Sequence, residues 1–311
     1  MKKGIMLLTA LLLVIGLTAC GGKSKEDGAK SAKTISIMTP YLSSVTTNEM
    51  VESLKKQASD KGWKANVVDT KGDMGQLASR MEDVISSKTN AIVLVSTDPN
   101  QLKSQIQRAK EKNIPVLGCD SGYIEGMVMN ATSDNKEMSK LITDHMFQTL
   151  GNEGKIVILT HRPHPGVLAR TVQLDEMMKD KPGISTVTEQ QVEVPGPIES
   201  ARKQMESLLL SNKAKGSISA VWAGWDEAAI GAAQAIEAAG RKDIIVTGID
   251  GNSQAVDMIK KDSPLVATVK QNFTGMTEIV VKQLDLVFQG KPAEGTEMYA
   301  PASLITKDNA K

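Results

Sequence analysis

The chain has 311 residues, of which 41% are hydrophobic and 23% charged, so it is long enough for two globular domains. Its 37 basic and 36 acidic residues give a net charge of +1, which leaves no electrostatic case for binding nucleic acid or an anionic membrane surface. The sequence contains two cysteines, Cys20 and Cys119, so a disulfide framework is excluded.

The N-terminal segment has the pattern of an export signal. Lys2 and Lys3 precede an apolar stretch, 5–17, that is too short for a stable membrane-spanning helix. It leads into LTACG around Cys20, which resembles the lipobox of bacterial lipoproteins; an ordinary signal peptide with an incidental cysteine is the alternative. We therefore predict a signal peptide over 1–19, a lipidated Cys20 and a flexible polar tether over 20–33, and hence an extracytoplasmic protein held at the membrane by lipid.

From Thr34 onward, short apolar runs alternate with amphipathic segments. We expect strands at 35–38, 65–68, 91–95 and 114–119 in the first half of the chain. The sequence TTNE at 46–49 has the form of a capping box that opens a helix, and Asp73 and Asp98 are expected to cap the next two helices. Four successive β-α units with short connections predict a parallel sheet covered by helices on both faces.

A second series of the same units follows a helix expected after Asp134. The expected strands are 155–160, 185–192, 218–223, 244–249 and 266–269, and the expected helices are 166–179, 198–212, 226–239, 253–261 and 274–289. The predicted fold class is therefore α/β, with two doubly wound, Rossmann-like parallel sheets whose carboxyl edges face each other across a cleft. A cleft between domains is where small-ligand sites are usually found.

Polar and aromatic side chains gather where the predicted strands end. Asp120 follows the buried run IPVLGC and lies where open α/β sheets place their ligands, although a carboxylate that only caps a turn is the alternative. Five of the nine aromatic residues fall at such ends: Tyr41, Tyr123, Trp222, Trp225 and Phe273. Flat aromatic faces beside Asp, Arg and Gln side chains suit a sugar, which offers C–H faces and paired hydroxyl groups.

Five motifs follow one another along the chain: IPVLGCD at 114–120, SDN at 133–135, WDEAAIGAAQAIEAAG at 225–240, VTGIDG at 246–251 and ATVKQ at 267–271. In order and spacing they resemble the landmarks of type I periplasmic sugar-binding proteins of the ribose-binding class. The resemblance implies two lobes, 34–134 plus 272–300 and 135–271 plus 301–311, joined by three hinge crossings near Asp134, Gln271 and Ala300. It also implies that the ligand is held by Asp120, Arg170, Asp250 and Gln271.

The chain departs from the ribose-binding relatives at further positions of the expected site. Those relatives carry an Asn at the position of Trp225, an Arg at that of Ser121 and an aromatic pair at those of Thr46 and Thr47. We therefore expect a ligand other than ribose: another pentose or hexose, a polyol such as an inositol or a short-chain alditol, or a furanose-like signal. The remaining expected ligand-binding residues are Trp225, Trp222, Tyr41, Ser121, Thr46 and Thr47.

The resemblance implies a solute-binding lipoprotein of an ABC importer, a monomer without cofactor or catalytic activity that delivers a sugar or polyol to a membrane permease. A sensory or quorum-signal receptor with the same fold is an alternative. A secreted glycoside hydrolase with Asp120 and Asp250 as acid and base is another. The sequence HRPH at 161–164 has no neighbouring carboxylate or cysteine for a metal site, so we expect a polar loop that faces the cleft.

Overall fold

The computed structural model describes residues 32–310 of the chain. The predicted signal peptide, Cys20 and most of the predicted tether lie outside the described residues. Among the residues that are described, no helix is both long and apolar enough to cross a membrane.

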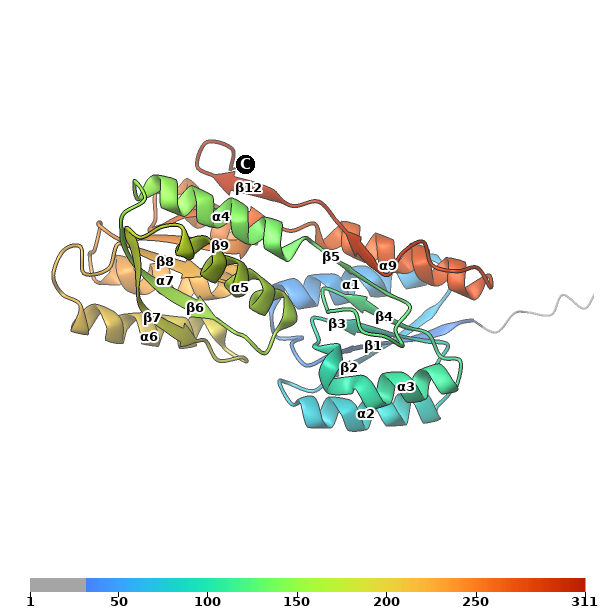
Figure 1. Ribbon diagram of the computed structural model, residues 1–311. Coiled ribbons are helices and arrows are strands. Elements are labelled where there is room, and N and C mark those ends of the chain that lie inside the picture. Colours follow the sequence, from blue (N-terminus) through green and yellow to red (C-terminus); the bar gives the residue numbers. More distant parts are fainter. Residues whose placement is uncertain (1–31, 311) are drawn as a thin grey trace, which may run out of the picture. The chain divides into compact units, whose positions relative to one another are not determined.

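Two six-stranded sheets organise residues 32–310 (Figure 1). The first, in the order β11-β5-β4-β3-β1-β2, consists of β1 (Thr34–Thr39), β2 (Lys64–Asp69), β3 (Ala91–Val95), β4 (Val116–Cys119), β5 (Met129–Thr132) and β11 (Glu297–Tyr299). The second, in the order β12-β10-β9-β8-β6-β7, consists of β6 (Gly154–Thr160), β7 (Ile184–Gln191), β8 (Ala220–Ala223), β9 (Ile245–Asp250), β10 (Leu265–Lys270) and β12 (Ser303–Thr306). Neighbouring strands in both sheets are parallel, except that β12 runs antiparallel to β10.

Helices cover both faces of each sheet (Figure 1). In the N-lobe, the lobe of the first sheet, α1 (Val45–Asp60) and α9 (Phe273–Phe288) pack on one face, and α2 (Met74–Ser86), η1 (Pro99–Leu102) and α3 (Lys103–Glu111) on the other. In the C-lobe, the lobe of the second sheet, α4 (Asn135–Thr149) and α5 (Pro165–Lys179) face α6 (Pro197–Ser211), α7 (Asp226–Ala238) and α8 (Ser253–Lys260) across the sheet. The predicted fold class, two doubly wound α/β lobes, is confirmed.

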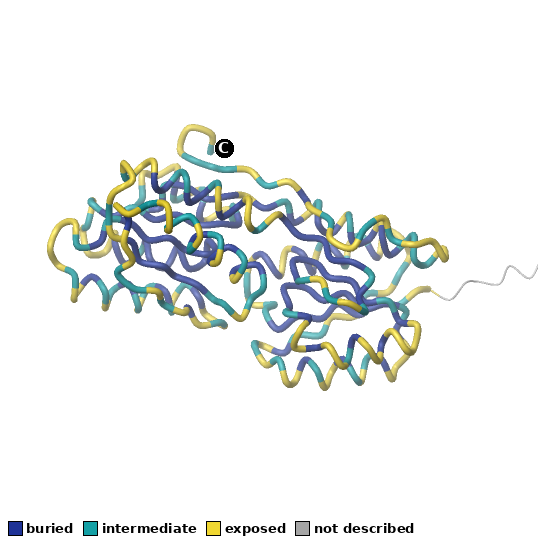
Figure 2. The backbone as a smooth tube through the Cα atoms, in the orientation of Figure 1, coloured by how far each residue is buried: buried dark blue, intermediate teal, exposed yellow. Residues whose placement is uncertain are grey.

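The burial of each strand depends on its position in the sheet. Strand β3, with the sequence AIVLV, is buried along its whole length because helices cover both of its faces. The edge strands β2 and β7 are much more accessible: β2 has no fully buried residue, and in β7 only Ile184 is buried. Figure 2 accordingly shows the central strands in the dark blue of buried residues.

Local capping chemistry starts several helices at the expected residues. The side chains of Asp73, Asp98 and Asp134 accept hydrogen bonds from backbone N–H groups at the beginning of α2, η1 and α4. The predicted capping box at 46–49 is wrong, because α1 begins at Val45 with Ser44 as its N-cap residue. Thr46 and Thr47 lie in the first turn, and the Thr47 hydroxyl donates to the hydroxyl of Ser96 rather than to the helix backbone.

The chain passes between the two lobes three times, from β5 to α4, from β10 to α9 and from β11 to β12. The predicted crossings near Asp134, Gln271 and Ala300 fall in these three connections. Each lobe is therefore assembled from segments that are far apart in the sequence. That the connections work as a hinge stays a prediction.

Gly231 lies where α7 packs against α6. A Cβ atom added at this position would overlap the carbonyl oxygen of Ile198 and lie 3.0 Å from the Cβ atom of Ala201. We expect Gly231→Ala to force the helices apart and to lower the free energy of unfolding by about 1–3 kcal/mol, measured by urea denaturation. The control is Gly75→Ala in the exposed first turn of α2, where the nearest atom would lie 3.4 Å away. An equal loss in both variants would contradict the role assigned to Gly231.

Candidate functional site

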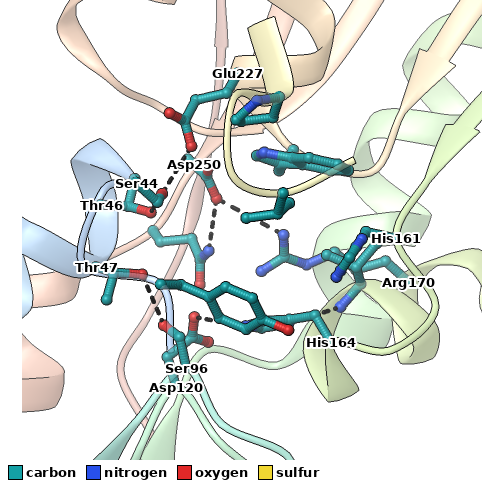
Figure 3. Close-up of a pocket in the computed structure, with 16 residues that line it drawn as sticks. Ser44, Thr46, Thr47, Ser96, Asp120, His161, His164, Arg170, Glu227 and Asp250 are labelled. Atoms are coloured by element: carbon teal, nitrogen blue, oxygen red, sulfur yellow. Dashed lines mark hydrogen bonds and ion pairs between the residues drawn. The ribbon is translucent and has the colours of Figure 1, made fainter. Parts of the chain in front are cut away.

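A pocket lies at the carboxyl ends of strands from both sheets (Figure 3). The predicted ligand-binding residues that line it come from both lobes: Tyr41, Thr46, Thr47, Asp120, Arg170, Trp225, Asp250 and Gln271. The structure thus brings most of the expected residues together around one shared space.

Two predicted residues lie elsewhere. Trp222 is fully buried in the C-lobe core, and its indole N–H donates to the hydroxyl of Thr143 at 3.1 Å. As a residue within β8, it points to a face of the sheet rather than beyond the strand end. Ser121 joins the ends of β3 and β4, because its hydroxyl donates to the Leu94 carbonyl at 3.0 Å and accepts from the backbone N–H of Thr97 at 3.1 Å. Of the five aromatic residues at predicted strand ends, Tyr41 and Trp225 line the pocket.

Several residues that line the pocket were not among the predicted site residues. They are Ser44, Ser96, His161, His164 and Glu227, with a few apolar neighbours. The two histidines belong to the HRPH loop that was expected to face the cleft, and Glu227 follows Trp225 at the start of α7. Their positions just beyond predicted strands were a usable signal, whereas the approach of Glu227 to Ser44 of the other lobe required the tertiary structure.

Three pocket residues have positive φ angles, a backbone conformation that is unfavourable for residues other than glycine. Ser96, Asp120 and Asp250 have φ angles of 50°, 51° and 146°, and each lies at or directly after the end of β3, β4 or β9. Such conformations cost about 1–3 kcal/mol each and cluster at functional sites, where the surrounding structure enforces them. Figure 3 shows the side chains of all three around the pocket.

Arg170 occupies the centre of the polar cluster although it is only 2% exposed. Its Nε donates to Oδ1 of Asn135 at 2.8 Å, and its Nη1 donates to the carbonyl oxygen of Gly224 at 2.9 Å and lies 3.7 Å from Oδ1 of Asp250. Gln271 approaches the same carboxylate, since its Nε2 donates to Oδ1 of Asp250 at 2.9 Å. The Oε1 atom of Gln271 is buried without a hydrogen-bond partner among residues 32–310, so it is available to a donor on a ligand.

The carboxyl groups around Arg170 are harder to ionise than free ones. Burial raises the pKa of Asp120, against the lowering effect of Arg170 and of a hydrogen bond from Thr132. Burial also raises the pKa of Asp250, and the like charge of Asp226 raises it further, whereas Arg170 lowers it. Asp226 lies behind the pocket, where its carboxylate accepts from the Thr268 hydroxyl at 2.7 Å and from the backbone N–H of Asn252 at 2.9 Å. The one guanidinium group of Arg170 therefore lowers the pKa of all three buried carboxyl groups, but burial raises each pKa by more.

The HRPH loop contributes two side chains to the pocket and one to the surface. His161 and His164 line the pocket, whereas Arg162 forms ion pairs with Glu189 at 2.6 Å and Asp175 at 3.3 Å. The loop is followed directly by α5, which starts with His164 as its N-cap residue. Within residues 32–310, no group of three or more His, Cys, Asp or Glu side chains is arranged to hold a metal ion.

The sequence matches the model of the periplasmic binding protein domain over residues 35–292. The chain belongs to the periplasmic binding protein family. The resemblance inferred from the sequence motifs is thereby confirmed at the level of the family.

Relatives of this periplasmic binding protein match almost its whole length. The ribose import binding protein RbsB of Bacillus subtilis is 28% identical over 314 residues, which cover 99% of this chain and 100% of that protein. A xylitol-binding protein of Mycolicibacterium smegmatis is 26% identical, and the matched region covers 95% of this chain and 83% of that protein. The crystal structure of an ABC transporter solute binding protein from Agrobacterium vitis with bound allitol has a TM-score of 0.85 and 27% identity, covering 90% of this chain and 97% of that one.

The raised pKa of Asp250 makes the stability of this periplasmic binding protein depend on pH. A carboxyl group with a higher pKa in the folded than in the unfolded state binds more protons when folded, so it destabilises the fold progressively as the pH rises above about 4. Asp250→Asn removes this effect and relieves the like-charge repulsion on Asp226. We expect the free energy of unfolding of the variant, relative to that of the natural protein, to increase between about pH 5 and pH 7.

Urea denaturation at each pH measures this difference. Asp257→Asn is the matched control, because Asp257 is an exposed residue of α8 whose side chain is 60% accessible. The change of this difference with pH should be larger for Asp250→Asn than for the control. A constant difference for Asp250→Asn would show that its carboxyl group titrates normally in the folded protein.

Proposed function

We propose that this protein is the extracytoplasmic solute-binding component of an ABC importer, and that it binds an uncharged sugar or polyol between its lobes. The observation that carries the proposal is the convergence of Asp120 from the N-lobe with Arg170 and Asp250 from the C-lobe on one pocket. A polyhydroxylated molecule can donate to the carboxylates and accept from the guanidinium group at the same time. It would thereby connect the two lobes.

The strength of such contacts is sufficient for tight binding. Neutral hydrogen bonds contribute about 0.5–1.5 kcal/mol net, and those to charged partners about 1.5–3 kcal/mol. Micromolar affinity corresponds to about 8 kcal/mol, so a small number of contacts to Asp120, Arg170, Asp250 and Gln271 is enough. Since the contacts come from both lobes, the ligand would favour the closed arrangement by its differential affinity, and a permease would receive the closed form.

The polar pocket walls favour, over ribose, a polyol or a sugar whose ring packs against few aromatic side chains. The rings of Tyr41 and Trp225 both pack against the ring of His161 in edge-to-face geometry, with centroids 6.0 and 6.3 Å apart. Hydroxyl groups of Thr46, Thr47 and Ser96 line the N-lobe wall of the pocket. The relatives named for xylitol and described with bound allitol support this ligand class.

Binding without catalysis is the activity that the relatives support, since those described above are named as binding proteins. In the hydrolase alternative, Asp120 and Asp250 would act as acid and base. Asp250 already accepts from Gln271 at 2.9 Å and lies 3.7 Å from Arg170, so these contacts fix the orientation of its carboxyl group, as a ligand-binding role requires. A sensory receptor would use the same pocket, and the presence of permease and ATPase genes beside the gene for this protein would distinguish transport from that role.

The proposed ligand class is tested by thermal unfolding of the purified protein with ribose, xylitol, allitol and myo-inositol. We expect at least one to raise the unfolding temperature, because a ligand at 100 times its Kd adds about 2.7 kcal/mol of stability. Calorimetry with that ligand should give one site per chain, and Asp120→Asn should weaken binding by about tenfold or more, since a bond to a charged acceptor is lost.

Asp257→Asn, on the exposed surface of α8, should bind like the natural protein. The ligand should be recovered chemically unchanged. Product formation would favour the hydrolase, and an unaltered affinity in Asp120→Asn would place the site elsewhere.

We further propose that Cys20 carries a lipid anchor that holds the protein on the outer face of the membrane as a monomer. The support is the lipobox-like LTACG sequence after the apolar segment. Cells grown with a labelled fatty acid should incorporate the label into the natural protein and fractionate it with membranes. Cys20→Ser should abolish labelling and release the protein into the soluble extracytoplasmic fraction, whereas Cys119→Ser should change neither. Labelling of Cys20→Ser would contradict the anchor.

A further inference from the structure

The protonation of His164 is fixed by the start of α5. Its Nδ1 atom accepts hydrogen bonds from the backbone N–H groups of Gly166 at 3.1 Å and Val167 at 3.3 Å. Nδ1 must therefore be unprotonated, and in the neutral ring the proton lies on Nε2. Burial, together with the positive charge of Arg170, lowers the pKa of His164 to about 3, so the ring stays in this tautomer at neutral pH.

The donor at Nε2 points toward the other lobe. Nε2 of His164 lies 3.9 Å from Oδ2 of Asp120, and within residues 32–310 it makes no hydrogen bond. The separation is too long for a direct bond, but one oxygen atom can lie about 2.8 Å from both. Figure 3 shows the two side chains facing each other at the border of the pocket. Asp120 ends an N-lobe strand and His164 starts a C-lobe helix, so an atom between them touches both lobes.

We propose that His164 is a specificity-determining residue, and that the ligand places a hydroxyl group between His164 and Asp120 as a bridge from one lobe to the other. The inference rests on the proposed function and names the group that the pocket recognises. A hydroxyl group accepts from the imidazole N–H with its lone pair and donates its own proton to the carboxylate. No proton is transferred.

Other substituents cannot make both bonds. A carboxylate would repel Asp120, an ammonium group has no lone pair for the imidazole N–H, and a hydrogen atom in a deoxy compound leaves both partners unpaired. His164 thus accounts for selection of uncharged polyols over sugar acids and amino sugars at this one position. His161 does not duplicate the role, because its Nδ1 lies 3.0 Å from the carbonyl oxygen of Val192 and must carry the proton of the neutral ring. Its Nε2 is therefore an acceptor.

The variant for the test is His164→Asn. Asparagine is a favourable N-cap residue, so the start of α5 is retained, but its short side chain does not reach the bridging position. His145→Asn is the matched control, because His145 lies on α4 and does not line the pocket. The probes are ribose, xylitol, allitol and myo-inositol, each with its monodeoxy analogues, and the measurement is calorimetric Kd.

For the natural protein and His145→Asn, we expect one monodeoxy analogue of a bound probe to lose about tenfold or more in affinity. For His164→Asn, the parent probe should bind more weakly, and removal of the same hydroxyl should then cost clearly less than in the natural protein, because only its bond to Asp120 is left to lose. An equal loss on hydroxyl removal in both backgrounds, for every analogue, would overturn the bridge. Binding of none of the probes to the natural protein would overturn the proposed function instead.

Discussion

The buried charge of Arg170 is the interaction on which the rest of the site depends. A guanidinium group that is almost fully removed from water is stable only with close, well-oriented partners. Asn135 and Gly224 supply neutral oxygen atoms, and Asp250 supplies the opposite charge. Asn135 is the first residue of α4, directly after the crossing from β5, so the polar cluster is attached to a connection between the lobes. Any displacement of that connection therefore alters the surroundings of the buried charge.

A polar contact between Ser44 of the N-lobe and Glu227 of the C-lobe joins the two lobes at the pocket. The Ser44 hydroxyl donates to Oε2 of Glu227 at 2.7 Å, whereas it does not cap a backbone N–H group of its own helix α1. The carboxylate of Glu227 is thus held at the N-terminal end of α1, where the helix dipole favours negative charge. Burial raises the pKa of Glu227, and the hydrogen bonds from Ser44 and the Val45 backbone oppose that rise. The N-terminus of an N-lobe helix is stabilised here by a C-lobe side chain.

The sequence predicts those strands and helix starts that depend on residues close together in the chain. It misses features that depend on contacts between residues far apart in the chain. The apolar run before Asp120 and the capping carboxylates of Asp73 and Asp134 identify strands and helix starts without further information. Strand β5 was missed because its central residue, Asn130, is polar and is satisfied by distant Ser121. Trp222 was wrongly assigned to the pocket although the expected strand 218–223 and β8 both end at residue 223. It lies inside the strand, and its side chain packs in the C-lobe core on one face of the sheet.

The balance of charge in the pocket limits which class of ligand it can accept. Ser121 stands where the family resemblance places an arginine in ribose-binding relatives, and its hydroxyl is used to join β3 to β4. Among the pocket-lining residues of the described chain, 32–310, Arg170 is then the one Lys or Arg side chain, and it faces the carboxyl groups of Asp120, Asp226 and Asp250, whose pKa values are all raised by burial. A ligand with a carboxylate or phosphate group would bring another negative charge into this low-dielectric region, where the described part of the chain lines the pocket with no second Lys or Arg side chain to pair with it. Hydroxyl groups avoid that penalty because they donate protons to the carboxylates while remaining uncharged, so an uncharged polyhydroxylated molecule is the ligand class that the electrostatics of the pocket favour.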